Sequence, residues 1–141
     1  MCCCTRRSAM LVMAAAPLSL AGRVTASASL AAEHREFIAA AFRMKDEAVA
    51  KGDQPYGAVV VRDGRIVGFG PSRVVLKKDA NAHAEREAIR DAQARLGTAD
   101  LSECVLYSTS RPCAVCERAA AQAKIARMIH GADATDAGPP Q

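Results

Sequence analysis

Residues that bind transition metals stand close to a carboxylate in two short segments of the chain. His83-Ala84-Glu85 is the first segment, and Pro112-Cys113-Ala114-Val115-Cys116 is the second, with Cys113 30 residues after His83. The Cys-x-x-Cys spacing places both sulfurs on one face of a first helical turn. The positive end of a helix stabilises thiolates, the form that binds metal. The sequence therefore predicts that His83, Cys113 and Cys116 hold one metal ion.

The number of ligands indicates the kind of metal site. Three protein ligands with one open position are typical of a catalytic zinc ion rather than a structural one. Such an ion lowers the pKa of a bound water molecule to roughly 7–9. Glu85 is the nearby carboxylate in a position to move the protons of that water. We therefore expect hydrolytic chemistry with one Zn²⁺ per chain and Glu85 as the catalytic residue.

Two other interpretations of these residues remain open. A structural zinc site would need a fourth ligand, for which Cys104 and His130 are candidates. A free cysteine more often packs as a small apolar residue. A redox Cys-x-x-Cys pair is the second alternative, but it gives no role to His83 and Glu85.

The elements that must position these residues alternate between helix and strand. Three segments have the apolar spacing or the start and stop signals of helices: residues 33–50, 83–96 and 112–124. Four short apolar runs indicate strands: residues 57–62, 65–70, 104–108 and 125–130. Asp63-Gly64 lies between the first two runs and is a strong hairpin signal. The pattern predicts an α/β fold, a three-layer α/β/α sandwich with a mixed sheet, in which both ligand-bearing helices begin at one crevice.

The C-terminal part of the chain gives weaker signals. Residues 71–82 are polar and predict a loop, and the tail after Gly131 predicts no further element. A sheet that stopped at residues 125–130 would leave an open edge. We therefore expect either a partner on that edge, as in a homodimer, or a C-terminal strand and helices that are short or missing.

The quoted motifs resemble those of a known family. His83-x-Glu85 followed by Pro112-Cys113-x-x-Cys116 is similar to the signature of the zinc-dependent cytidine and deoxycytidylate deaminase-like superfamily. The segments 55–61 and 79–90 resemble the family's first strand and zinc helix. The resemblance covers about residues 33–137, and it is nearest the branch of guanine, cytosine and tRNA adenosine deaminases.

The resemblance implies a reaction and a substrate class. The reaction would be hydrolytic deamination of a small-molecule nucleobase or nucleoside with a guanine-like or cytosine-like base, with release of ammonia. Gly57 and Ala58 would line the base pocket through their backbone. Apart from the resemblance, Tyr56 and Tyr107 are candidates either to border the site or to pack in the sheet. Deamination of adenosine in tRNA is an alternative, as is an inactive zinc-binding relative that acts as a binding module.

The chain differs from the family pattern at two positions near the expected site. Ser72 stands where an asparagine that binds substrate is common, so we expect Ser72 to bind substrate with a shorter reach. Arg111 stands where a glutamate often precedes Pro-Cys. This change reverses a charge beside the metal, and we hypothesise that it favours an anionic group on the substrate.

The first 28 residues differ in composition from the rest. They hold three arginines and no acidic residue, whereas the other 113 hold 16 Lys and Arg against 15 Asp and Glu. Arg6-Arg7, an apolar stretch and Ala26-Ser27-Ala28 predict a twin-arginine export signal over residues 1–28. Residues 29–141 would then form the deaminase domain in a periplasmic or exported location. A cytoplasmic protein with an N-terminal extension is the alternative.

Composition and charge exclude several classes of protein. The hydrophobic fraction of 50% excludes a wholly disordered chain. No apolar run reaches the ~18 residues that a membrane span needs. The near-neutral domain has no surplus of positive charge for a phosphate backbone, which argues against nucleic acid as a partner.

Overall fold

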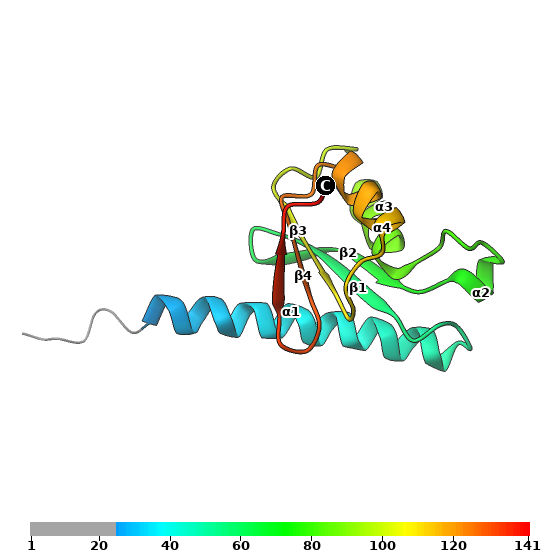
Figure 1. Cartoon of the computed structure of the whole chain (residues 1–141), viewed down its shortest axis with the longest axis horizontal. Coiled ribbons are helices and arrows are strands. Elements are labelled where there is room, and N and C mark those ends of the chain that lie inside the picture. Colours follow the sequence, from blue (N-terminus) through cyan, green and yellow to red (C-terminus); the bar gives the residue numbers. More distant parts are fainter. Residues whose placement is uncertain (1–24) are drawn as a thin grey trace, which may run out of the picture.

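The computed structural model describes residues 25–141, which form four helices and five strands (Figure 1). The N-terminal half contains α1 (Thr25–Ala50), β1 (Gly57–Arg62), β2 (Arg65–Pro71), α2 (Val74–Lys77) and α3 (Ala84–Leu96). The C-terminal half contains β3 (Cys104–Ser108), α4 (Ala114–Gln122), β4 (Arg127–His130) and β5 (Thr135–Gly138). No helix of this described part is both long enough and apolar enough to span a bilayer.

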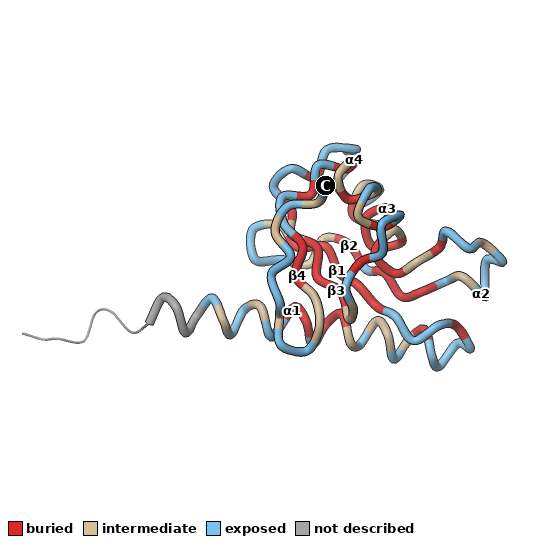
Figure 2. The backbone as a smooth tube through the Cα atoms, viewed as in Figure 1, coloured by how far each residue is buried: buried red, intermediate tan, exposed pale blue. Residues whose placement is uncertain are grey.

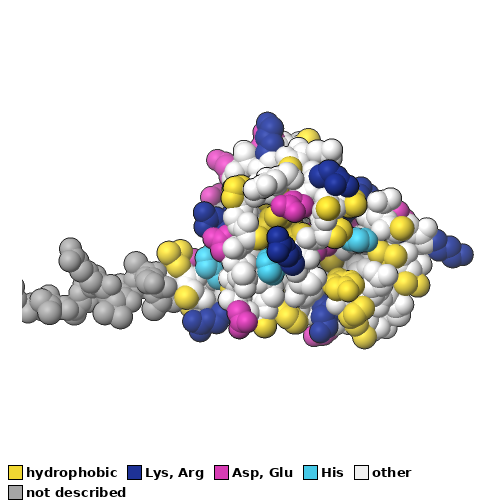
Figure 3. Space-filling view, in the orientation of Figure 1, with side chains coloured by type: hydrophobic (Ala, Val, Ile, Leu, Met, Phe, Trp, Pro, Cys, Tyr) yellow, Lys and Arg dark blue, Asp and Glu magenta, His cyan; other side chains and the backbone are white. Residues whose placement is uncertain are grey.

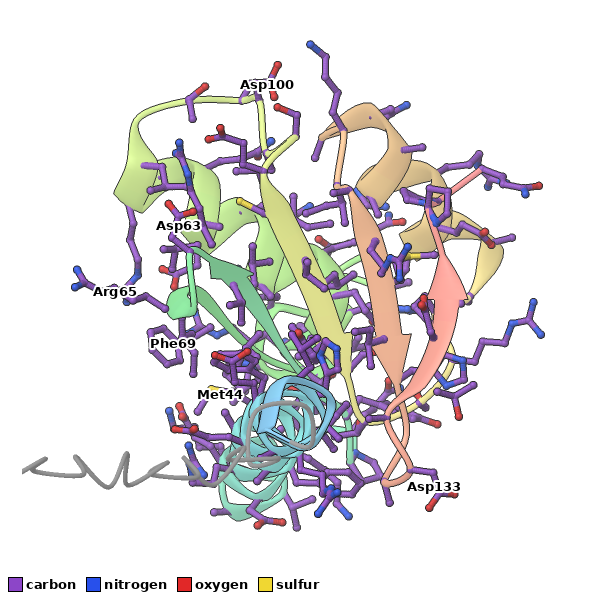
Figure 4. All side chains as sticks on the ribbon, turned by 90° about the vertical axis from the view of Figure 1, so that its left-hand side faces the viewer. Met44, Asp63, Arg65, Phe69, Asp100 and Asp133 are labelled. Carbon is purple, nitrogen blue, oxygen red and sulfur yellow. The ribbon has the colours of Figure 1, made fainter. Side chains whose placement is uncertain are left out.

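The strands form one mixed sheet in the order β2-β1-β3-β4-β5. The β3–β4 pair is parallel, and the other neighbouring pairs are antiparallel. Figure 4 shows Asp63 and Asp100 at one end of the sheet and Asp133 at the other. β1 begins and β3 and β4 finish at the end marked by Asp133, because each strand there runs opposite to β1.

Helices cover both faces of the sheet. Val59 and Val61 of β1 pack with α1, whereas Ala58 and Val60 pack with α3 and α4 on the opposite face. This alternation is the period of two that a strand buried on both faces requires. Figure 2 shows the buried residues gathered on the strands and on the helix turns that face them. The predicted three-layer α/β sandwich with a mixed sheet is confirmed.

The C-terminal tail forms a strand where the sequence predicted no further element. The segment after Gly131, predicted to hold no further element, forms β5 and covers the β4 edge that was expected to be open. β5 is short, polar and mostly exposed. Its backbone pairs with β4 and Asp136 accepts a 2.6 Å bond from Arg127, so no apolar pattern marks it in the sequence. The predicted homodimer stays a prediction.

The predicted export signal and the predicted start of the first helix both lie near the N-terminus. Residues 1–24 lie outside the described residues, so the export signal over residues 1–28 stays a prediction. The first described helix begins at Thr25, eight residues before the predicted start at residue 33. The predicted cleavage site at Ala26-Ser27-Ala28 therefore falls within the first residues of α1.

Asp53 explains why a helix forms within the predicted loop 71–82. Its carboxylate accepts bonds from the amides of Val75 and Leu76, at 3.0 and 2.9 Å, at the N-terminus of α2. It also accepts bonds from the Ser72 hydroxyl and the Gln54 amide, at 2.9 and 2.8 Å. Burial alone would raise the pKa of Asp53, but these four donors outweigh it and lower the pKa below its ordinary value.

Gly70 explains how closely α3 approaches the sheet. A Cβ atom at Gly70 would overlap the carbonyl oxygen of Ala84 and the amide nitrogen of Ala88. Ala84 is the first residue of α3 and lies between His83 and Glu85. The absence of a side chain at Gly70 therefore fixes the position at which α3 begins.

Gly70→Ala should destabilise the protein by about 1–3 kcal/mol because the added methyl forces α3 away from β2. Urea unfolding measures the loss. Ala94→Ser is the matched control, since it adds one heavy atom on the exposed side of the same helix and should change stability by less than about 0.5 kcal/mol. Equal stability of the Gly70 variant and the wild type would refute this account of the contact.

Asp53→Asn should lower the free energy of unfolding at pH 7 by about 1–3 kcal/mol, since the amide cannot accept all four bonds. The lowered pKa of Asp53 means that its stabilisation is complete above the unfolded pKa of about 4. That stabilisation is lost as the pH falls through the folded pKa. The difference between wild type and variant should therefore shrink at acidic pH, as measured by urea unfolding.

The exposed Asp46 on α1 offers the control. Asp46→Asn should leave stability within about 0.5 kcal/mol of wild type at every pH. A difference between wild type and Asp53→Asn that stays constant down to pH 3 would contradict the assigned role of the carboxylate.

Candidate metal and catalytic site

Two helices begin at the same end of the sheet and bring the candidate ligands together. His83 directly precedes α3 and Cys113 directly precedes α4, and both have extended backbone conformations. Neither side chain caps its own helix by a hydrogen bond. Cys116 lies in the first turn of α4, where the Glu117 amide donates to the Cys113 carbonyl at 2.8 Å. The three donor atoms therefore point into the space where the positive ends of two helices meet.

The distances between these donor atoms fit a zinc ion. Nδ1 of His83 lies 3.5 Å from the Cys116 sulfur and 3.7 Å from the Cys113 sulfur. All three donor atoms lie within 4.8 Å of one another. In tetrahedral zinc sites, Zn–S bonds of about 2.3 Å and Zn–N bonds of about 2.0–2.1 Å place nitrogen and sulfur ligands about 3.6 Å apart. The structure thus brings together the three residues that the sequence predicts as ligands.

Glu85 lies beside this cluster and is buried, with 6% of its surface exposed. Its Oε2 accepts a 3.4 Å hydrogen bond from the Cys116 thiol. Burial raises the pKa of Glu85. Burial, together with the charge of Glu85, raises the pKa of Cys116 as well. Two acids that are buried side by side favour their ionised forms only when a cation lies between them. The raised pKa values of Glu85 and Cys116 are therefore consistent with a site built to hold a cation.

The two candidates for a fourth ligand are not part of this cluster. Cys104 begins β3 and is buried in the core, whereas the site lies beyond Ser108 at the other end of that strand. His130 ends β4 and pairs with Ser108. Within residues 25–141 the candidate metal-binding cluster contains His83, Cys113 and Cys116. The described residues therefore offer three protein ligands, which leaves one position for water or substrate.

A cavity opens beside the cluster. Its volume is about 580 Å³, within the range of about 300–1,000 Å³ found for small-molecule sites. Its lining consists of Gln54, Pro55, Tyr56, His83, Ala84, Glu85, Ser110, Arg111 and Cys113. Loops at one end of the sheet supply one wall, and the starts of α3 and α4 supply the other. The buried Glu85 carboxylate and two of the candidate ligands, His83 and Cys113, therefore face a space that accepts a small molecule.

The residues expected to bind substrate occupy different places. Gly57 and Ala58 are buried in β1, and the lining on this side reaches Tyr56, one residue earlier. Thr109 bonds both the amide and the carbonyl of Gly57, at 3.2 and 3.0 Å. Ser72 is buried, donates its hydroxyl to Asp53 and is outside the cavity lining. A role of Gly57, Ala58 and Ser72 in substrate binding stays a prediction.

Sequence analysis missed part of the lining. Gln54 and Ser110 line the cavity from loops that precede β1 and α4, and these common polar residues carry no spacing signal of their own. Their place next to Pro55-Tyr56 and Arg111-Pro112 is the one clue in the sequence. Tyr56 borders the cavity as expected. Tyr107 does not, because it packs on the α1 side, where its hydroxyl lies 2.8 Å from Nδ1 of His34.

Comparisons with a family model and with curated proteins point to the same family. Residues 31–132 match the family described as the cytidine and deoxycytidylate deaminase zinc-binding region. The chain is 38% identical to a guanine deaminase of Bacillus subtilis over 105 residues, which cover 74% of this chain and 67% of the relative. It is 38% identical to a tRNA-specific adenosine deaminase of Aquifex aeolicus over 96 residues, which cover 68% of this chain and 64% of the relative.

Solved structures agree with these relatives. The crystal structure of the guanine deaminase from Bacillus subtilis matches with a TM-score of 0.67 and 37% identity, over 70% of this chain and 64% of that one. A structure from a study of tRNA:A34 deaminases matches with a TM-score of 0.66 and 35% identity, over 68% of this chain and 70% of that one. The chain thus spans about two thirds of the length of these proteins.

The named relatives are deaminases, which are hydrolases that act on C–N bonds. The family match covers more than half of the chain and includes all three candidate ligands and Glu85. This chain belongs to the cytidine and deoxycytidylate deaminase family of zinc-binding enzymes.

Proposed function

We propose that this protein hydrolytically deaminates a nucleobase or nucleoside with a guanine-like or cytosine-like base and releases ammonia. One observation carries the proposal: His83, Cys113 and Cys116 form one cluster, and His83, Cys113 and the buried Glu85 line the cavity beside it. A guanine deaminase among the relatives supports the guanine-like base.

Each residue of the cluster has a defined part in such a reaction. A zinc ion held by the three ligands would act as a Lewis acid that lowers the pKa of a water molecule. The Glu85 carboxylate would take one proton from a water molecule and deliver it to the ring nitrogen, while the water oxygen bonds to the amino-bearing carbon. Glu85 would then move the second proton of that water to the amino group as the carbonyl forms. The C–N bond breaks, ammonia leaves and Glu85 is again ionised.

The opposite wall of the cavity offers groups that recognise a base. Tyr56 lines the cavity with 45% of its surface exposed, and an aromatic ring of this kind can stack on a base. Gln54 carries both an amide donor and a carbonyl acceptor, and Ser110 carries a hydroxyl. These groups can bond the edge of a base whose amino-bearing carbon faces Glu85.

Adenosine in tRNA is the second candidate substrate, because the Aquifex aeolicus relative is named a tRNA-specific adenosine deaminase. An inactive zinc-binding relative is the candidate from another class. An ammonia-release screen of the zinc-loaded protein separates them when guanine, cytosine, cytidine and a tRNA are offered in parallel. We expect release from a free base or nucleoside. Release from tRNA alone supports the second candidate, and no release supports the third.

Cys113→Ser and Cys116→Ser should each reduce the bound zinc far below one ion per chain, since each removes a thiolate ligand. Cys104→Ala is the matched control, because Cys104 is a free cysteine packed in the core. The control should retain about one zinc, as measured by mass spectrometry of the metal. Loss of zinc from the Cys104 variant, or its retention in both ligand variants, would contradict the assigned site.

Glu85→Gln should retain zinc but slow ammonia release by about 10²–10⁴-fold, because an amide cannot carry the proton between water and base. Glu36→Gln, a change of the same kind on the exposed side of α1, should release ammonia at the wild-type rate. An enzymatic assay for ammonia measures both variants. Full activity of the Glu85 variant would remove the proposed mechanism.

A further inference from the structure

One wall of the cavity is an exposed tripeptide, Gln54-Pro55-Tyr56, that lies between two buried residues. Asp53 precedes it with 8% of its surface exposed, and Gly57 of β1 follows it. Because the three side chains of this wall are not packed in the core, their position depends on the polar contacts that hold the two ends. At Gly57 these contacts are two hydrogen bonds with Thr109, at 3.2 and 3.0 Å.

The Asp53 carboxylate holds the other end of this wall. Its Oδ1 accepts a 2.8 Å bond from the Gln54 amide and a 2.9 Å bond from the Ser72 hydroxyl. The Ser72 amide in turn donates to the Tyr56 carbonyl at 3.1 Å. One carboxylate oxygen therefore reaches both ends of the tripeptide, Gln54 directly and Tyr56 through Ser72.

The second carboxylate oxygen of Asp53 fixes the segment that joins the two walls of the cavity. Its Oδ2 accepts bonds of 3.0 and 2.9 Å from two amides of α2. The Arg73 amide donates to the Ala82 carbonyl at 3.0 Å, and Ala82 directly precedes the candidate ligand His83. The segment over residues 72–82 is thus closed on itself and leads from the tripeptide wall to the wall that carries the candidate ligands.

Recognition of a base in this cavity depends on short-range contacts with its walls. The formally charged side chains of the lining are Arg111 and Glu85, which have opposite signs, apart from the cysteine ligand. On the face in Figure 3, Lys and Arg side chains alternate with Asp and Glu rather than forming a surface of one sign. A neutral base would be held by the ring of Tyr56 and the amide of Gln54, and its affinity depends on how firmly those groups are held before binding.

We propose that Asp53 is a positioning residue for substrate binding, which holds Gln54 and Tyr56 opposite Glu85, directly and through Ser72. This inference rests on the proposed function, because it explains the affinity of the same cavity for a base. Asp53 is outside the cavity lining, so it acts on the substrate through these residues. It contributes to binding of the base and not to the proton transfers, which belong to Glu85 on the other wall.

Steady-state kinetics of the zinc-loaded protein test the proposal through ammonia release from guanine, cytosine and cytidine. Asp53→Asn should raise KM about 10-fold and change kcat by less than about twofold, the pattern of a variant that loses binding but not the chemical step. Ser72→Ala removes the hydroxyl bond and keeps the amide bond to Tyr56, so its KM should rise by a smaller factor. A kcat that falls at an unchanged KM would overturn the proposal.

Two controls separate positioning from a general loss of stability. Asp46→Asn makes the same change at an exposed position of α1 and should keep the wild-type KM. Ile125→Val leaves a small cavity in the core just before β4, at the end of the sheet opposite the site. It should lower stability without raising KM. A rise in KM equal to that of Asp53→Asn would overturn the proposal, because lost stability alone would then explain both.

Fluorine NMR of protein labelled with fluorotyrosine follows the tripeptide wall without any substrate. The chain has two tyrosines, so two resonances are expected, which Tyr107→Phe assigns. Tyr107 packs on the α1 side of the sheet and serves as the internal reference. Asp53→Asn and Ser72→Ala should shift or broaden the Tyr56 resonance and leave the Tyr107 resonance unchanged. An unchanged Tyr56 resonance, or equal changes in both, would contradict the positioning role.

The two measurements distinguish failure of this inference from failure of the proposed function. Ammonia release with a wild-type KM in Asp53→Asn overturns the inference and leaves the proposed function standing. No release by the wild type, with a change confined to the Tyr56 resonance, overturns the proposed function and supports the positioning of the wall. A KM that rises as much in Ser72→Ala as in Asp53→Asn, with no change at Tyr56, would assign Ser72 to direct contact with substrate and overturn the role of Asp53.

Discussion

Two helix N-termini have to meet at one end of the sheet, and the packing of α3 and α4 against that sheet sets the geometry of the site. Small residues make this packing possible. Ala84, Ala88 and Ala92 of α3 lie fully buried in the core, and Gly70 of β2 leaves room for the backbone of α3. A displaced α3 would carry His83 and Glu85 away from the cysteines of α4. The chemistry of the site therefore depends on alanines and a glycine that take no part in it.

Burial and charge then act on the groups that the helices deliver. Glu85 and Cys116 are both buried and in contact. Burial raises the pKa of Glu85, and burial together with the charge of Glu85 raises the pKa of Cys116. A divalent cation at His83, Cys113 and Cys116 would offset this effect and favour the ionised thiol. Metal binding and the ionisation of the site are thus coupled, while the cavity beside them remains open on the side of Tyr56 and Arg111.

Much of the fold and most of the reactive cluster could be predicted from sequence, because their signals are local. The Asp63-Gly64 turn has positive φ angles at both residues, as the hairpin signal requires. Helix α3 ends at Gly97 in the left-handed conformation, as a glycine stop signal predicts. The candidate metal ligands can be recognised from their residue types and spacing alone.

The features that sequence analysis missed depend on contacts between distant segments. β5 is held by backbone pairing with β4 and has no alternation of apolar residues. α2 forms because Asp53, in a loop about 20 residues earlier, caps it. Gln54 and Ser110 become cavity residues only when the ends of β1 and β3 are adjacent. Periodicity along the chain cannot reveal such pairings.

X-ray absorption spectroscopy of the zinc-loaded protein tests the central claim most directly, because it counts the atoms around the metal. The account predicts two sulfur ligands at about 2.3 Å and two lighter ligands at about 2.0–2.1 Å, one from an imidazole and one from solvent. A zinc ion bound by a third sulfur or a second imidazole, or a protein that binds no zinc, would contradict it.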